Sequence, residues 1–265
     1  MADIEFEKDL KVAETGIEGL KVVDLAVHGD SRGWFKENWQ RAKMCALGIP
    51  DLKVVQNNTS YNDSRGVTRG IHAEPWDKFI SVARGSVFGA WVDLREGSAT
   101  YGKVFTCTLD PSRAIYVPRG VGNSFQALED GTAYTYLVDA HWSLELKKTY
   151  TFVNLADPEL AIEWPIPLDE ATVSEADLNH PMLRDVVPMA PKRTSSPAAT
   201  ASWAMRCARS PRSAAWRRTS TSATSTPSTC PTRTPIRSTT GRSTARSSTA
   251  APTRQSTGPR PPRAA

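Results

Sequence analysis

The sequence has no run of apolar residues close to the roughly 18 that a membrane-spanning helix needs. Its first residues, MADIEFEKDLKV, are charged and lack the apolar segment of a secretory signal. Cysteine is scarce and shows no C-x-x-C spacing, which argues against a zinc ribbon or a disulfide framework. We therefore expect a soluble, cytoplasmic protein with reduced thiols and no membrane partner. The cysteines are Cys45, Cys107, Cys207 and Cys230.

Acidic residues and lysine are both absent from residues 194–265, which contain 12 arginines. That segment carries a charge of +12, so residues 1–193 carry −7 within the total of +5. The basic character of the whole chain thus comes from its C-terminal part, and we expect no nucleic-acid partner for the acidic part. An arginine-rich arm that binds a polyanion is the alternative left open by this composition.

Nearly all of residues 194–265 are Ala, Ser, Thr, Pro or Arg, with only nine exceptions. The segment has no hydrophobic period, so burial of apolar surface could not offset the entropy of ordering it. We therefore predict a folded domain over residues 1–190 and a disordered tail over residues 191–265.

Alternating apolar positions dominate the first part of the chain. In residues 86–94, Phe88, Ala90, Val92 and Leu94 recur with period two, which is typical of a β-strand. Glycine- or proline-containing turns separate such segments at roughly ten-residue spacing, with no long helical pattern between them. An all-β sandwich or barrel of the jelly-roll type is predicted. The other clear strand segments are 104–109, 114–118 and 132–138. A few short helices are expected beside the strands, of which only the one over 41–48 shows in the sequence pattern.

Five short motifs follow one another between residues 20 and 183: DSRGWFKENW, Q-x-N-x-S, G-x-x-R-G-x-H with K-x-I-x-V-x-x-G, AYTYLV and SEADLNHP. Together they resemble the dTDP-4-dehydrorhamnose 3,5-epimerase family, whose members have a cupin jelly-roll fold. The resemblance implies an enzyme that epimerises carbons 3 and 5 of dTDP-4-dehydro-6-deoxy-D-glucose. It also implies no metal and no cofactor, and a homodimer in which the N-terminal strands and nucleotide-contacting residues work across the subunit interface.

Such a reaction removes a proton next to a carbonyl and returns one on the other face, so it needs a base, an acid and a group that stabilises the enolate. By resemblance, His72 is the base, Asp177 orients it, Tyr136 is the acid and Lys78 stabilises the enolate oxygen. The residues implied in substrate binding are Arg32, Phe35 and Glu37 for the nucleotide, with Phe35 stacking on thymine, and Gln56, Asn58, Arg69 and Asn123 for the rest of the substrate.

Each of these residues also has a purely structural interpretation. A single histidine on a strand is commonly structural, and Tyr136 shares a strand face with Tyr134 in a manner typical of a core. Lys78 and Arg69 fit solvated charges at a strand edge, and Asp177 fits a helix cap. The five motifs in order favour catalysis.

A metal site is not expected, because metal-binding cupins place several histidines together. Here Ala73 and Glu74 follow His72, and no second histidine is expected within its reach. His141 and His180 are expected at the surface.

Asn123 stands where the family commonly has histidine, and it cannot titrate. This departure leaves open whether both carbons or only one are epimerised. A non-catalytic cupin that binds a sugar nucleotide is a further alternative.

The composition of the tail is also what GC-rich DNA yields when it is translated out of frame. We back-translated TSSPAATASWAMRCARS with GC-rich third bases and shifted the reading frame by one base. In the shifted frame the codons can encode LVTGGNGQLGNALRAL. This is a strand, a glycine-rich turn and a helix start, and it resembles the dinucleotide-binding opening of the dTDP-4-dehydrorhamnose reductases. We therefore expect residues 191–265 to be an out-of-frame remnant of a reductase domain, and the parent to be a bifunctional epimerase and reductase.

Overall fold

The computed structural model describes residues 4–191, and the tail predicted beyond this point lies outside the described residues. The strands are β1 (Lys11–Glu14), β2 (Lys21–Asp24), β3 (Val27–Asp30), β4 (Gly33–Lys36), β5 (Gln56–Asn62), β6 (Val67–Ala73), β7 (Lys78–Arg84), β8 (Val87–Asp93), β9 (Val104–Leu109), β10 (Arg113–Val117), β11 (Val121–Ala127), β12 (Thr132–Val138), β13 (Thr151–Phe152) and β14 (Thr172–Val173). The helices are α1 (Arg41–Ala46), α2 (Leu144–Lys147), α3 (Glu175–Leu178) and the 3₁₀ turn η1 (Leu183–Asp185).

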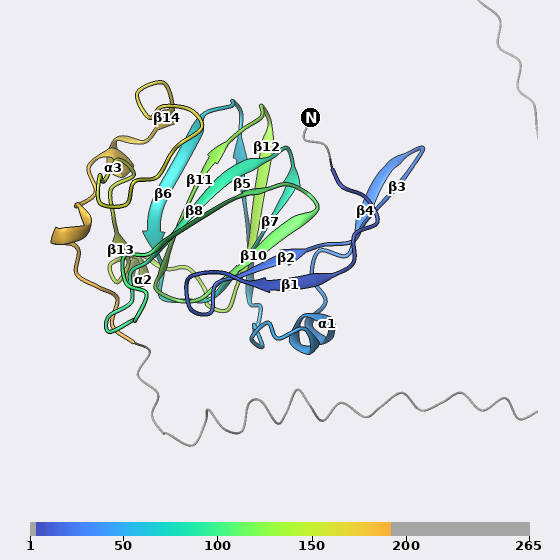
Figure 1. Cartoon of the computed structure of the whole chain (residues 1–265), viewed down its shortest axis with the longest axis horizontal. Coiled ribbons are helices and arrows are strands. Elements are labelled where there is room, and N and C mark those ends of the chain that lie inside the picture. The colour runs from blue at the N-terminus through green and yellow to red at the C-terminus, as the bar shows by residue number, and fades with distance from the viewer. Residues whose placement is uncertain (1–3, 192–265) are drawn as a thin grey trace, which may run out of the picture. The chain divides into compact units, whose positions relative to one another are not determined.

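Two sheets face each other (Figure 1). One sheet has the order β1-β2-β10-β7-β12-β5, and the other has the order β13-β6-β11-β8-β9 with β14 added beside β6. Strands that follow one another in the chain repeatedly lie in opposite sheets, as in β6–β7 and β11–β12. This is the cupin jelly roll, and the predicted all-β fold is confirmed. No helix among residues 4–191 is both long and apolar enough to cross a membrane.

The space between the sheets is filled by the main core. Ile80 and Val82 of β7 meet Trp91 of β8 and Phe125 of β11 there, and all four are buried. The predicted strand segments 104–109 and 132–138 coincide with β9 and β12, which confirms the period-two pattern as the signal that positions them.

The strand β8 is buried on both faces, which its alternation alone does not reveal. Trp91 points into the space between the sheets, whereas Val92 packs on the outer side against Val153, Leu155 and Met189. The segment from β13 to residue 191, yellow to orange in Figure 1, therefore covers the outer face of the β6-β11-β8 sheet. This cover also contains α3, which contributes a residue to the candidate active site.

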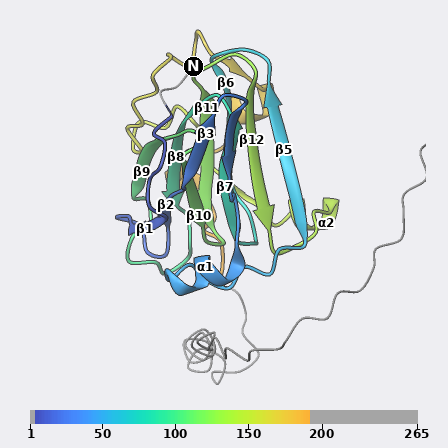
Figure 2. The same cartoon turned by 90° about the vertical axis from the view of Figure 1, so that its right-hand side faces the viewer.

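The predicted helix is confirmed as α1, which Figure 2 shows below the strands. The Gln40 side chain caps it by accepting a hydrogen bond from the Lys43 N–H at 2.6 Å. Met44 is buried with Phe79 and Tyr116, on the face of the first sheet that points away from the main core. With α2, α3 and η1, the structure also confirms the expectation of a few short helices. The positions of these three were not predicted, because helices of three or four residues are too short to show an apolar period.

Neither Cys45 nor Cys107 forms a disulfide within the described part of the chain. Burial raises the pKa of the Cys107 thiol to about 12, so the thiol is protonated at neutral pH. The expectation of reduced, packed cysteines is confirmed for these two, whereas Cys207 and Cys230 lie outside the described residues.

Asp93, at the end of β8, is a buried residue, and both of its carboxylate oxygens accept hydrogen bonds. It accepts hydrogen bonds from the Arg95 guanidinium at 2.7 and 2.8 Å, from the Ser98 hydroxyl at 2.6 Å and from Thr100 at 2.5 Å. Burial alone would raise the pKa of Asp93, but these hydrogen bonds outweigh it and lower the pKa to about 2.

We expect Asp93 to make the stability of the fold depend on pH. Its folded-state pKa of about 2 lies below its ordinary value of 3.8, so its contribution is complete above about pH 5 and is lost as the pH falls toward 2. A shift of this size corresponds to about 2 kcal/mol of unfolding free energy. Asp93→Asn should therefore be less stable than the unaltered chain in urea unfolding at pH 7, with a gap that narrows toward pH 3. The exposed Asp63→Asn is the matched control, and a gap that stays constant with pH would contradict the prediction.

Candidate active site

His72 lies on β6, between two neighbouring strands. It is in register with Asn123 of β11 on one side and with Phe152 of β13 on the other. Its side chain is 32% exposed, so one edge of the ring faces open space. The edge of the Phe152 ring packs against it at 5.4 Å between centroids.

Asp177 of α3 lies behind His72, although the two residues are 105 positions apart in the chain. The Asp177 Oδ1 is 2.8 Å from His72 Nε2, and Oδ2 accepts a hydrogen bond from the Gly70 N–H at 3.2 Å. Burial raises the pKa of Asp177, but the hydrogen bonds from His72 and Gly70 lower it to about 2. An ionised carboxylate only accepts, so Nε2 of His72 carries the hydrogen, and Nδ1 is the ring nitrogen that can take up a proton.

Glycine is required at position 70 for this arrangement. A Cβ there would lie 2.4 Å from the Ser124 Cβ and 2.9 Å from the Asn123 carbonyl, and the backbone φ is +129°. The absence of a side chain allows β6 to approach the bulge of β11 between Asn123 and Phe125. The same close approach brings the Gly70 N–H to Asp177.

A cavity of about 220 Å³ opens in front of His72, between the two sheets. The predicted residues that line it are Arg69, His72, Lys78, Asn123 and Tyr136. His72 comes from one sheet, and Tyr136 of β12 and Lys78 of β7 come from the other. Residues predicted from separate motifs thus meet in one pocket, with a base candidate and an acid candidate on its two walls.

Tyr136 has the protonation state that a proton donor needs. Burial and the nearby Glu74 carboxylate raise the pKa of Tyr136 to about 12, against an opposing effect of Arg69. The phenol is therefore protonated across the neutral range. In contrast, Tyr134 is a core residue: it is 1% exposed, stacks on Phe125 at 4.1 Å and donates its hydroxyl hydrogen to Asn123 Oδ1 at 2.9 Å.

Lys78 is a buried cation in the same pocket, 3% exposed, and its Nζ lies 2.5 Å from the Glu74 carboxylate. The strand-edge interpretation of Lys78 is therefore wrong. Glu74 also lines the pocket, although the sequence analysis gave it no role, and the same is true of Ser60, Phe125 and Tyr134. Its place two residues after His72 was the available signal, because side chains two apart on an extended chain point to the same side.

The remaining predicted binding residues on β5 lie beside this pocket. Gln56 Nε2 donates to Asn58 Oδ1 at 2.8 Å, and Gln56 Oε1 accepts from the Trp142 N–H at 3.0 Å. Asn58 is in register with Tyr136 of β12. The two amides therefore form a polar row along the edge strand, next to the acid candidate.

The three predicted nucleotide contacts lie elsewhere in the chain. Arg32 and Phe35 belong to the β3–β4 hairpin, which projects from the sheets in Figure 1, and Glu37 follows it. Arg32 forms an ion pair with Asp30, Glu37 pairs with Lys43 at 2.8 Å, and Phe35 is 70% exposed. Within one chain the structure does not bring these residues to His72.

His180 is not a surface residue, and the expectation that no second histidine lies within reach of His72 was wrong. Its Nε2 is 3.1 Å from the same Asp177 Oδ1 that His72 contacts, and its side chain is only 14% exposed. The turn after α3 returns His180 to the dyad, which spacing alone did not indicate. His72, Asp177 and His180 each offer one potential metal-ligand atom within 4.8 Å of the others. Their N···O distances are those of hydrogen bonds, so these groups satisfy one another, and the absence of a metal stays a prediction.

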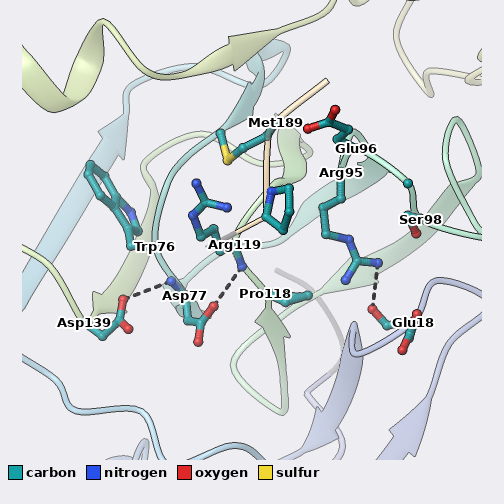
Figure 3. A pocket seen from close by; sticks show the side chains of 12 residues that line it. Glu18, Trp76, Asp77, Arg95, Glu96, Ser98, Pro118, Arg119, Asp139 and Met189 are labelled. Carbon is teal, nitrogen blue, oxygen red and sulfur yellow. Dashed lines mark hydrogen bonds between the residues drawn. The ribbon is translucent and has the colours of Figure 1, made fainter. Parts of the chain in front are cut away.

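A second, larger cavity of about 390 Å³ contains none of the predicted site residues (Figure 3). Its acidic group Asp77 accepts hydrogen bonds from the Arg119 N–H at 2.8 Å and the Tyr116 hydroxyl at 2.9 Å. Arg95 donates to Asp93 and, at 3.0 Å, to the Glu18 carbonyl, as the dashed line in Figure 3 marks. These groups are engaged with the protein itself, so we place the active site at the His72 pocket.

Residues 14–185 match the model of a protein family described as dTDP-4-dehydrorhamnose 3,5-epimerase. The chain belongs to this family. The matched span contains every predicted site residue, from Arg32 to Asp177.

Known relatives agree with this assignment. An RmlC homologue from Streptococcus pyogenes is 51% identical over 198 residues, which cover 72% of this chain and 99% of the relative. The crystal structure of RmlC from Streptococcus suis in complex with dTDP-D-xylose is 53% identical with a TM-score of 0.66, covering 70% of this chain and 97% of that one. A dTDP-4-dehydrorhamnose 3-epimerase from Streptomyces niveus is 36% identical over 163 residues, covering 59% of this chain and 76% of the relative.

Proposed function

We propose that this enzyme converts dTDP-4-dehydro-6-deoxy-D-glucose to dTDP-4-dehydro-L-rhamnose by inverting carbons 3 and 5. The observation that carries the proposal is the pocket in which His72 of one sheet, paired with Asp177 of α3, faces Tyr136 and the Lys78 cation of the other sheet. The complex of the Streptococcus suis relative with dTDP-D-xylose supports a dTDP-linked sugar as the substrate.

The chemistry proceeds by proton transfer alone. His72 takes a proton from a carbon next to the 4-carbonyl, and the electron pair left on that carbon moves to the carbonyl oxygen as an enolate. Lys78 stabilises the enolate oxygen, and Tyr136 returns a proton to the opposite face of the carbon. Asp177 stabilises the protonated His72 ring. Arg69, at the same pocket, is suited to the diphosphate.

The test is solvent-exchange NMR in deuterium oxide with dTDP-4-dehydro-6-deoxy-D-glucose. The substrate should lose the proton signals of C3 and C5 because each position is deprotonated and then receives a deuteron from solvent. Two labelled and inverted positions are the expected result. An absence of exchange at both positions would refute the proposal and favour a cupin that only binds sugar nucleotides.

A single-position epimerase is the second candidate. It is favoured by Asn123, which replaces a titratable histidine at this position, and by the similarity to the Streptomyces niveus 3-epimerase. The same NMR experiment separates the two, because a single-position enzyme inverts only one carbon. The bifunctional alternative depends on the proposed reductase remnant after residue 190, outside the described residues, and the coding DNA across codons 190–200 decides it.

We further propose a homodimer in which the β3–β4 hairpin of one subunit completes the pocket of the other. Phe35 is exposed, and none of Arg32, Phe35 and Glu37 lines the pocket of its own chain. Both observations support this arrangement, which the family resemblance also implies.

Mixing two variants that are impaired in different ways tests the dimer, with activity measured at a dTDP-sugar concentration at which Phe35→Ala alone shows little turnover. Phe35→Ala should weaken dTDP binding, whereas His72→Asn should remove the base. If the subunits exchange, one of the two pockets of a mixed dimer has His72 from one chain and Phe35 from the other. Each mixed dimer should therefore recover about half of the normal activity, and a randomly mixed sample about a quarter. Sedimentation analysis of the unaltered protein provides the control for assembly. A monomer, or the absence of any recovery in a verified mixed dimer, would contradict the arrangement.

A further inference from the structure

His180 shares the catalytic carboxylate with His72. Two imidazole Nε2 atoms converge on the same oxygen, Asp177 Oδ1, at 2.8 Å from His72 and 3.1 Å from His180. The other carboxylate oxygen accepts from the Gly70 N–H. Each of these partners donates a hydrogen, because the ionised carboxylate has none to give.

The ring of His180 is held firmly in this position. It stacks on Phe152 with centroids 4.6 Å apart and an interplanar angle of 24°, and it meets the His72 ring edge-on at 5.5 Å. The backbone carbonyl of His180 accepts a hydrogen bond from the Asn154 side chain at 3.0 Å. Phe152 thus contacts both imidazoles.

The surroundings keep His180 uncharged. Its burial and the neighbouring His72 lower the pKa of His180, against an opposing effect of Asp177. A neutral imidazole that donates from Nε2 has one defined tautomer, with an unprotonated Nδ1. The charged or titratable groups on the pocket side of His72 are Arg69, Glu74, Lys78, Tyr134 and Tyr136.

We propose that His180 is a positioning residue of the dyad, which keeps the Asp177 carboxylate directed at His72 and limits how strongly that carboxylate holds a protonated His72. Two donors on one oxygen divide its charge between them, so each hydrogen bond is weaker than a single one would be. A base that retained its proton too strongly would turn over slowly, because it must become neutral before the next abstraction. This inference rests on the proposed epimerase function.

Two substitutions separate the effect of the His180–Asp177 hydrogen bond from the effect of the stacking of His180 on Phe152. His180→Phe keeps an aromatic ring on Phe152 but removes the donor, whereas His180→Gln retains an N–H at nearly the same reach. In His180→Phe the undivided charge of Asp177 should move the acidic limb of the kcat/KM profile upward by about one pH unit, with KM on the plateau unchanged. In His180→Gln the acidic limb of the kcat/KM profile should lie at nearly the same pH as in the unaltered enzyme. Identical pH profiles in the unaltered enzyme and a folded His180→Phe would overturn the proposal.

A measurement without substrate keeps this inference distinct from the proposed function. The chain has four histidines, so ¹⁵N labelling of histidine yields few ring signals, and His180→Gln identifies the one from His180. The expected result is a neutral Nε2–H tautomer for His180 at pH 7. An Nδ1–H tautomer or a charged ring would overturn the proposal even if His180→Phe failed to fold. If the unaltered enzyme shows no exchange at C3 or C5, the proposed function fails, and the tautomer still decides whether His180 bonds to Asp177.

Discussion

Replacing His72 with asparagine is expected to lower kcat at least about a thousandfold, which is within the range that general base catalysis contributes. Asparagine preserves much of the size and polarity of the ring but cannot take up a proton at neutral pH. The exchange of both the C3 and C5 protons with deuterated solvent should stop together, because one base serves both carbons. The measurement is NMR-detected exchange, with dTDP affinity determined in parallel by calorimetry.

The matched control is His141→Asn, which alters an exposed histidine outside the pocket. It should exchange both protons at the rate of the unaltered enzyme. His72→Asn should also bind dTDP nearly as well as the unaltered enzyme, since the nucleotide contacts are assigned to other residues. Solvent exchange at an unaltered rate in a folded His72→Asn protein would exclude His72 as the base.

Tyr136→Phe is expected to separate proton removal from inversion. The base on the other wall of the pocket is intact in this variant, so the substrate should still exchange protons with solvent. The donor for the opposite face is missing, so formation of the inverted product should fall by about a hundredfold or more, most clearly at C5. The ratio of exchange to inversion, followed by NMR on one sample, is the decisive quantity.

Tyr61→Phe is the control, since Tyr61 is 55% exposed and lies on the neighbouring strand β5. Because the pKa of Tyr136 is raised to about 12, its loss of a proton should not limit activity anywhere below about pH 11. A Tyr136→Phe enzyme with unaltered rate and product stereochemistry would make Tyr136 a packing residue.

The strands β8, β9, β10 and β12 were predictable because each of them repeats a simple physical pattern. The alternation in 104–109 and 132–138, ended by turn residues, defines β9 and β12 without any knowledge of the partner strands. The burial of both faces of β8 was not predictable in this way. It depends on residues 153–189, which are remote in the chain and have no regular period of their own.

The site shows a similar division. His72 and Tyr136 were recognised from motifs that resemble a family, and periodicity alone would have left both as possible core residues. Glu74 and His180 were missed because their contacts in the site form only on folding, although the spacing of Glu74 from His72 already placed it on the same side of the strand. Glu74 gains its role from an ion pair with Lys78, and His180 gains its role from a turn after α3. Such contacts join residues from different helices and strands that come together in the folded chain. The local sequence pattern around each residue therefore contains little information about them.

The cover over the outer face of the second sheet affects the order in which the parts of the site become available during synthesis. This segment supplies Asp177 and His180, whereas His72 lies on a strand synthesised much earlier. A growing chain on the ribosome therefore exposes the histidine of β6 before its carboxylate partner has been translated. The His72–Asp177 pair therefore forms only when this cover, which is translated after β5–β12, docks on the second sheet.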